Sequence, residues 1–182
     1  MKWTELIVSN PTSLVFPDGI EAGITYYYQV VRSEWYSHAV IAISGKSEID
    51  LLDAVDDGQT VDEPRMHAIF GERLDEVFLF GGPKAYRLSS AGEVRETVEL
   101  FRNRELEEYW YTDLLATEPG IVVIYEKGCL LLDNALRVRW HVEKYINDFF
   151  DRVADNRLEF VLDGEERWSL SLVDGSTMNK PT

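Results

Sequence analysis

The residues of this sequence with the types and spacing for chemistry are carboxylates gathered in two short segments. One segment carries Asp53, Asp56, Asp57, Asp62 and Glu63, and the other carries Asp148, Asp151 and Asp155. Carboxylates held close together bind calcium or form an acid–base pair with separated pKa values. The acids around Gly58 do not follow the spacing of a calcium-binding loop. A solvated acidic surface is therefore the favoured interpretation of both segments.

Other catalytic and ligand-binding patterns are absent from the sequence. His38, His67 and His141 lie far apart and outside any HExxH or HxH pattern, and no nucleophile elbow, P-loop or GxGxxG is present. Residues 81–84 (GGPK) suggest a phosphate loop only superficially, and a hairpin turn explains them better. Cys129 lies in an apolar run, with three leucines directly after it, and is predicted to be buried and inert. The sequence thus predicts no metal site, no cofactor and no catalytic residue.

Aromatic residues form the second set of candidates. Tyrosines and tryptophans are consecutive at 26–28, 35–36 and 109–111. Neighbouring residues on a strand point to opposite faces, so at least one ring in each group is expected at the surface or at an interface. Exposed aromatic rings are typical of binding hot spots and of sugar-stacking platforms. Tyr27 and Trp110 are the candidates, and the alternative is a sheet buried on both faces.

The overall charge restricts the partners. The chain has 182 residues with 33 acidic and 18 basic side chains, a formal net charge of −15. Such a charge repels nucleic acids and anionic membranes and attracts basic proteins. The single cysteine excludes an internal disulfide, and the first residues lack the apolar core of a secretory signal. We therefore expect a cytoplasmic protein whose oligomeric state stays open.

An internal repeat is the clearest sign of the architecture. Residues 77–100 align without gaps to residues 121–144, with an apolar run, a glycine-containing turn, a second apolar run and a third segment in each. Three pairs are identical in the third segment: Arg95/Arg139, Val98/Val142 and Glu99/Glu143. Weaker copies cover 39–61 and 158–175. Short apolar runs separated by turn residues predict antiparallel hairpins.

One segment carries a family resemblance. Residues 132–140 (LDNALRVRW) resemble the strand–turn–strand signature of quinoprotein-type β-propeller blades, with Leu136 in place of the turn glycine. The resemblance is strongest over 77–144 and loose over 39–175. It implies that Trp140 packs between neighbouring blades, and it does not imply a quinone cofactor. A ring needs at least about four blades of four strands, so packed sheets fit this length as well as a closed propeller does.

The sequence therefore predicts a mainly β fold, an antiparallel meander of blade-like hairpin units. A single domain is expected over 1–175, followed by a polar tail over 176–182. One or two short helices are expected in addition. Helical spacing of Leu106, Tyr109, Trp110 and Leu114 favours a helix over 104–115, and a shorter one is conceivable at 66–70. Residues 145–154 fit either a helix or a strand.

Charge and the missing motifs together favour a non-enzymatic interaction module. Its function would be to bind and neutralise a basic protein, as immunity proteins do. The expected contact residues are Asp53, Asp56, Asp57, Asp62, Glu63, Tyr27 and Trp110. One alternative is a domain that binds carbohydrate or another small ligand through the aromatic groups. A second alternative is a hydrolase with a carboxylate pair drawn from Asp53, Asp57, Asp148 and Asp151.

Overall fold

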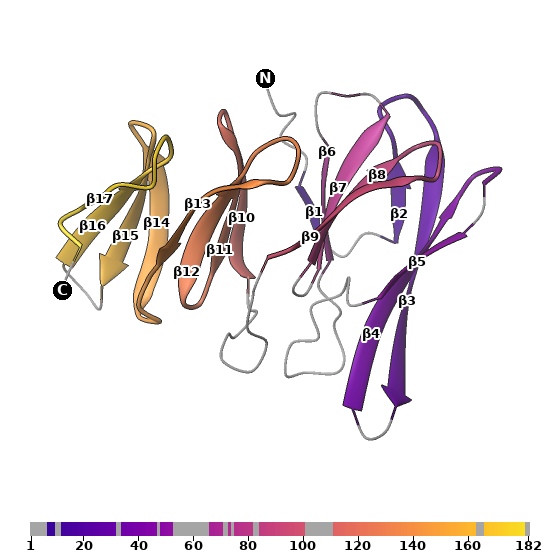
Figure 1. Ribbon diagram of the computed structural model, residues 1–182, viewed down its shortest axis with the longest axis horizontal. Helices are drawn as coiled ribbons and strands as arrows, with labels where there is room; N and C mark the ends of the chain where they lie inside the picture. Colours follow the sequence, from indigo (N-terminus) through magenta and orange to yellow (C-terminus); the bar gives the residue numbers. More distant parts are fainter. Residues whose placement is uncertain are drawn as a thin grey trace. The chain divides into compact units, whose positions relative to one another are not determined.

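The computed structural model consists of β-strands joined by turns and loops (Figure 1). It describes residues 7–9, 12–31, 34–46, 48–52, 66–70, 73, 75–81, 84–100, 111–162 and 166–180. The chain divides into two compact units, Met1–Trp110 and Tyr111–Thr182. No helix occurs in the described ranges, so they contain none long and apolar enough to cross a membrane.

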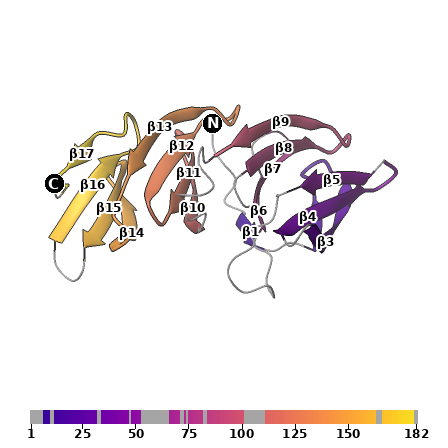
Figure 2. The same cartoon turned by 60° about the horizontal axis from the view of Figure 1, so that its bottom comes forward.

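The first unit contains two antiparallel sheets. One sheet has the order β2-β3-β4-β5, with the bounds Ser13–Val15, Glu21–Val31, Glu34–Ile43 and Glu48–Leu52. The other has the order β1-β6-β7-β8-β9, with the bounds Ile7–Ser9, Met66–Phe70, Glu76–Gly81, Lys84–Ser89 and Val94–Glu99. Both views show these sheets side by side (Figures 1 and 2). Their shared core includes Ile41 and Leu51 from the first sheet and Met66 and Leu79 from the second.

The second unit repeats this arrangement with two four-stranded sheets. The first follows the order β10-β11-β12-β13, with the bounds Tyr111–Thr117, Gly120–Tyr125, Gly128–Leu132 and Val138–Glu143. The second follows the order β14-β15-β16-β17, with the bounds Asp148–Ala154, Arg157–Leu162, Glu166–Ser171 and Thr177–Met178. Val122 and Leu131 face Phe160 and Trp168 in the core between the two sheets. Part of the predicted tail, Thr177–Met178, is thus a strand.

The sequence repeat corresponds to a structural repeat with the same strand register. Phe80 pairs with Ala85, and at the equivalent place Ile124 pairs with Cys129. The third strands agree as well, because each register shifts at the same point, next to the identical residues Arg95 and Arg139. The prediction of antiparallel hairpins over 77–100 and 121–144 is confirmed. The shared irregularity of the ladder is an additional finding of the structure.

The turn between the last two strands of each copy shows why Leu136 can occupy the position that glycine has in the first copy. Gly92 and Leu136 both have a left-handed backbone, with φ of 86° and 56°. A left-handed conformation costs a non-glycine residue about 1–2 kcal/mol. The Leu136 side chain is fully buried, and burying a leucine contributes about 1.5–3 kcal/mol. The leucine is tolerated because its burial offsets the backbone strain.

The expected helices are wrong where the structure describes the chain. Residues 111–115 of the predicted helix over 104–115 belong to β10, while residues 101–110 lie outside the described ranges. Residues 66–70 form β6. In the segment 145–154, for which helix and strand were both open, residues 148–154 form the strand β14. In each case an adjacent strand is available for pairing, and the resulting ladder outweighs a helical spacing of only two turns. The described strands form four separate antiparallel sheets, two in each unit.

Trp140 joins the two sheets of the second unit. Its indole Nε1 donates a hydrogen bond of 3.2 Å to the Leu172 carbonyl, at the end of β16. The ring also lies against Gly175, which has a φ of 73°. A Cβ at Gly175 would lie 3.0 Å from both Cβ and Cγ of Trp140. Only glycine satisfies both the backbone conformation and this close approach.

We expect Gly175→Ala to lower the free energy of unfolding by about 2–3 kcal/mol, since backbone strain and overpacking add. The matched control is Gly45→Ala, because Gly45 has a similar φ of 71° and open space around the added Cβ. The control should lose only about 1 kcal/mol. Urea denaturation of both variants measures the difference, and equal losses would contradict the packing role of Trp140.

Two aspartates hold the turns of the second unit. Asp133 Oδ1 accepts hydrogen bonds from the backbone N–H of Ala135 at 2.8 Å and of Arg137 at 3.0 Å. Partial burial acts to raise the pKa of Asp133, but these hydrogen bonds lower it overall. A hydrogen bond from the Ser176 N–H is the main reason that the pKa of Asp174 is lowered to about 2. The ionised carboxylates are the forms that stabilise the turns.

The pH dependence of stability follows from these lowered pKa values. An unfolded aspartate has a pKa of about 3.9, so the contribution of Asp174 is complete above about pH 4 and is lost as the pH falls through about 2. Carbon-13 NMR titration should place the Asp174 carboxyl near 2. Asp174→Asn should flatten this part of the stability profile, whereas Glu118→Gln should leave it unchanged. A titration near 3.9 would contradict the assignment.

Candidate interaction surface

The sheets β2–β5 and β14–β17 each have one face in the core of their unit and one outer face. In the second unit, the outer face of β14–β17 is charged but internally neutralised. Arg152 pairs with Glu159 at 2.7 Å, and Arg167 pairs with Asp151 at 2.6 Å. Such a face is suited to contact with water.

The outer face of β2–β5 in the first unit has a different character. Alternation along β5 directs Ile49 and Leu51 toward the core, which leaves Glu48 and Asp50 on the other side. Exposed Glu21 lies on the same outer face. The register continues this face to the row Tyr27–His38–Leu52, whose side chains lie outside the described set. Its other described side chains are small, apolar or uncharged: Ser13, Val15, Gly23, Thr25, Val40 and Ala42. We call the nine described residues the acidic face, which contains three carboxylates and no basic side chain.

A two-stranded arm continues from this sheet. The β3–β4 ladder runs from Ala22↔Ile43 to Val31↔Glu34, whereas β2 pairs only with residues 21–23 and β5 only with residues 38–42. Figure 1 shows the hairpin continuing past the ends of β2 and β5. The arm, residues 27–31 and 34–37, therefore consists of two strands without a third in the described part of the chain.

The arm contains one of the contact residues predicted from the sequence. Tyr27 pairs with His38, which in turn pairs with Leu52, so these residues form one row across three strands. The structure describes the backbone of Tyr27 but not its side chain. The acidic segment 53–63 follows Leu52 directly in the sequence. Six predicted contact residues lie outside the described ranges, five of them in that segment and one elsewhere: Asp53, Asp56, Asp57, Asp62, Glu63 and Trp110.

The carboxylates of the second predicted cluster do not form a pair. Asp151 is bonded to Arg167 on the outer face of its sheet. Asp148 is buried with 1% of its surface exposed, and its Oδ2 accepts a hydrogen bond from the Tyr145 N–H. The register places Asp148 opposite Leu162, and Arg167 in the adjacent row of the opposite face. A hydrolytic pair of Asp148 and Asp151 therefore has no geometric support.

A buried lysine accompanies Asp148. Lys144 Nζ donates hydrogen bonds to the carbonyls of Glu126 at 2.7 Å and Tyr145 at 3.3 Å. Burial lowers the pKa of Lys144, and the nearby Asp148 carboxylate opposes this. Burial likewise raises the pKa of the Cys129 thiol to about 12, so the prediction of a buried and inert cysteine is confirmed. These groups are held by backbone carbonyls inside the unit.

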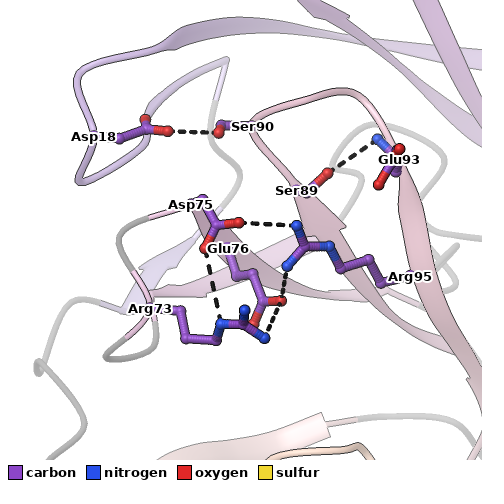
Figure 3. A network of polar contacts seen from close by, with 8 residues as sticks. All are labelled: Asp18, Arg73, Asp75, Glu76, Ser89, Ser90, Glu93 and Arg95. Atoms are coloured by element: carbon purple, nitrogen blue, oxygen red, sulfur yellow. Dashed lines mark hydrogen bonds and ion pairs between the residues drawn. The ribbon is translucent and has the colours of Figure 1, made fainter.

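A polar network ties the two sheets of the first unit together (Figure 3). Asp18, in the turn before β3, accepts a hydrogen bond of 2.5 Å from the Ser90 hydroxyl in the turn after β8. Nearby, Arg95 bonds to Asp75 at 2.9 Å and also to the buried carboxylate of Glu76. Arg73 reaches Glu76 at 3.3 Å from the other side. Two arginines compensate the charges of Asp75 and Glu76, and Asp18 is held by a hydroxyl group, so the network has a structural role.

Arg95 and its counterpart Arg139 give a matched test of this network. Arg95→Ala leaves Glu76 buried with only Arg73 beside it, so we expect a loss of about 1–3 kcal/mol in the free energy of unfolding. Arg139 is exposed, and Arg139→Ala should change stability by less than about 0.5 kcal/mol. Urea denaturation measures both values. Equal effects would show that Glu76 does not depend on Arg95.

Sequence reasoning identified the acidic segment over residues 53–63 but missed the acidic face. The signal was the alternation Glu48-Ile49-Asp50-Leu51, in which acidic and apolar residues exchange places along one strand. Glu21 gave no signal, because only the strand pairing brings it to the same face. Comparisons of the chain with protein-family models, curated proteins and solved structures found no match.

Proposed function

We propose that the protein is a non-enzymatic module that binds a basic protein through the acidic face of β2–β5. The observation that carries this proposal is the contrast between the two outer faces. The face of β14–β17 balances its charges with ion pairs, whereas the acidic face has three carboxylates and no basic residue. A surface that has evolved only for solubility needs no such one-sided charge.

The electrostatics of the whole chain support the same partner. With a net charge of −15, the protein attracts a cationic surface over about 10 Å at moderate ionic strength. Steering of this kind mainly raises the association rate, and added salt reduces it. Neutralisation of a basic toxin or nuclease, in the manner of an immunity protein, is one activity with these requirements. The buried Cys129 of this chain, which forms no disulfide, suits a reducing compartment such as the cytoplasm.

The experiment compares two triple variants that remove the same charge. Glu21→Gln, Glu48→Gln and Asp50→Asn together neutralise the acidic face. The control variant combines Glu93→Gln, Glu118→Gln and Glu143→Gln, three exposed carboxylates on other elements. Proteins retained on the immobilised chain at low salt and released at high salt are identified, and the most enriched basic protein is purified. Its affinity for each variant is then measured by biolayer interferometry.

We expect the acidic-face variant to bind about tenfold more weakly or worse, mostly through a slower association rate. The control variant should stay within about threefold of the unmodified chain, because it keeps the local charges of the face. Equal weakening by both variants would show a diffuse attraction to net charge, and binding that does not change with salt would overturn the proposal.

A further inference from the structure

The edges of the described sheets differ in how they are protected against pairing with another chain. Unpaired strand edges are templates for strand addition, and proteins block them with charges, bulges or very short strands. Here β1, β2 and β17 have three residues or fewer. The remaining edge strands carry charged residues, and several also have a register shift: β5, β9, β10, β13 and β14.

One described edge lacks all of these protections. β2 accompanies β3 only as far as a hydrogen bond from the Ile24 N–H to the Thr12 carbonyl. Beyond it, residues 27–31 (YYQVV) form a regular ladder with β4 and have no described neighbour on their other side. This stretch contains no charge, no proline and no glycine. Its aromatic and β-branched residues have high strand propensity.

The direction of the free backbone groups follows from the register. The Ile24 N–H points away from β4, toward β2. The β3–β4 ladder has no register shift from Ala22 to Val31, so every second residue after Ile24 has the same orientation. The N–H and C=O groups of Tyr28 and Val30 therefore point to the open edge. Those of Tyr27 and Gln29 point to β4.

We infer that this edge binds its partner by strand addition, with an extended basic segment of another protein pairing along residues 27–31. The inference rests on the proposed function for the charge of the partner. Main-chain hydrogen bonds supply affinity in this mode of recognition, and side chains flanking the added strand supply specificity. The added strand continues the sheet whose outer surface is the acidic face, and the net charge of −15 favours lysine or arginine side chains on it.

Charge decides between a foreign segment and a second copy of this chain. Two copies each carrying a net charge of −15 repel each other, and the edge lies in the same sheet as Glu21, Glu48 and Asp50. A basic strand instead gains from the same carboxylates. Within the chain itself, a short segment remote in sequence also adds to a sheet edge, because β1 pairs with β6 at Ile7↔Ile69.

The test uses two peptides of equal charge and a proline variant. The first peptide alternates lysine and valine over ten residues, and the second replaces two of its valines with proline so that it cannot form a continuous strand. Tyr28→Pro removes the outward N–H and keeps the bonds to β4, as a proline on an edge strand does. Tyr28→Thr is the matched control, since it changes the same side chain and retains the N–H.

We expect the unmodified chain to bind the lysine–valine peptide at least about tenfold more tightly than the proline peptide. Hydrogen exchange should show new protection at the Tyr28 and Val30 amides. Tyr28→Pro should abolish the preference between the peptides, and Tyr28→Thr should keep it. Circular dichroism checks that both variants fold. Equal binding of the two peptides by the unmodified chain, or the same behaviour of the two variants, would overturn strand addition.

Two further measurements separate this inference from the proposed function. In one outcome, Tyr28→Pro loses the preference for the lysine–valine peptide while neutralisation of the acidic face has no effect on binding. In that case the edge is a binding site, and the proposal that the acidic face binds a basic protein is wrong. If only the acidic-face variant weakens binding, the proposed function stands and strand addition is wrong. If sedimentation shows that the unmodified chain self-associates and Tyr28→Pro is monomeric, the occupant is a second copy, which overturns the inference.

Discussion

The structure depends on one constraint, which is that an antiparallel sheet with one apolar face must cover that face. Every described sheet meets it by packing against another sheet, with Ile41 and Leu79 on the two sides in the first unit and Leu131 and Phe160 in the second. A repeating hairpin sequence suits this solution, because each copy supplies a face for the next. The other face of a sheet does not pack in the core, so its side chains are not restricted to apolar residues and can serve a function.

The repeat also serves as an internal comparison. Positions that are alike in the two clear copies are those that build the sheet, such as the register shift at Arg95 and Arg139. Positions that differ show local adaptation. Leu100 and Lys144 occupy equivalent places and are both buried. The lysine is tolerated at this buried site because two backbone carbonyls accept hydrogen bonds from its Nζ and Asp148 lies nearby. A leucine would need neither.

Much of the architecture could be predicted from the sequence. Apolar runs of strand length, turn residues between them and an ungapped repeat predicted the hairpins, and the resemblance placed Leu136 at the turn position of a glycine. The helices could not be excluded, since Leu106, Tyr109, Trp110 and Leu114 repeat a helical spacing while their pairing partners are remote. Local pattern carries no information on a neighbouring strand that arrives later in the chain. β10 and β14 are strands because β11 and β15, which follow them in the chain, pair with them.

The acidic surface was predictable in charge but not in place. Net charge and the clusters at 53–63 and 148–155 are visible in any count of residues, yet the second cluster is divided by the two faces of β14–β17. The face with unbalanced charge is assembled from β3 and β5, which pair with β4 between them. Glu21 and Glu48 come together only through that pairing. A sheet therefore converts a diffuse excess of carboxylates into a directed surface, and the uncharged edge beside it gives that surface a place where a backbone can bind.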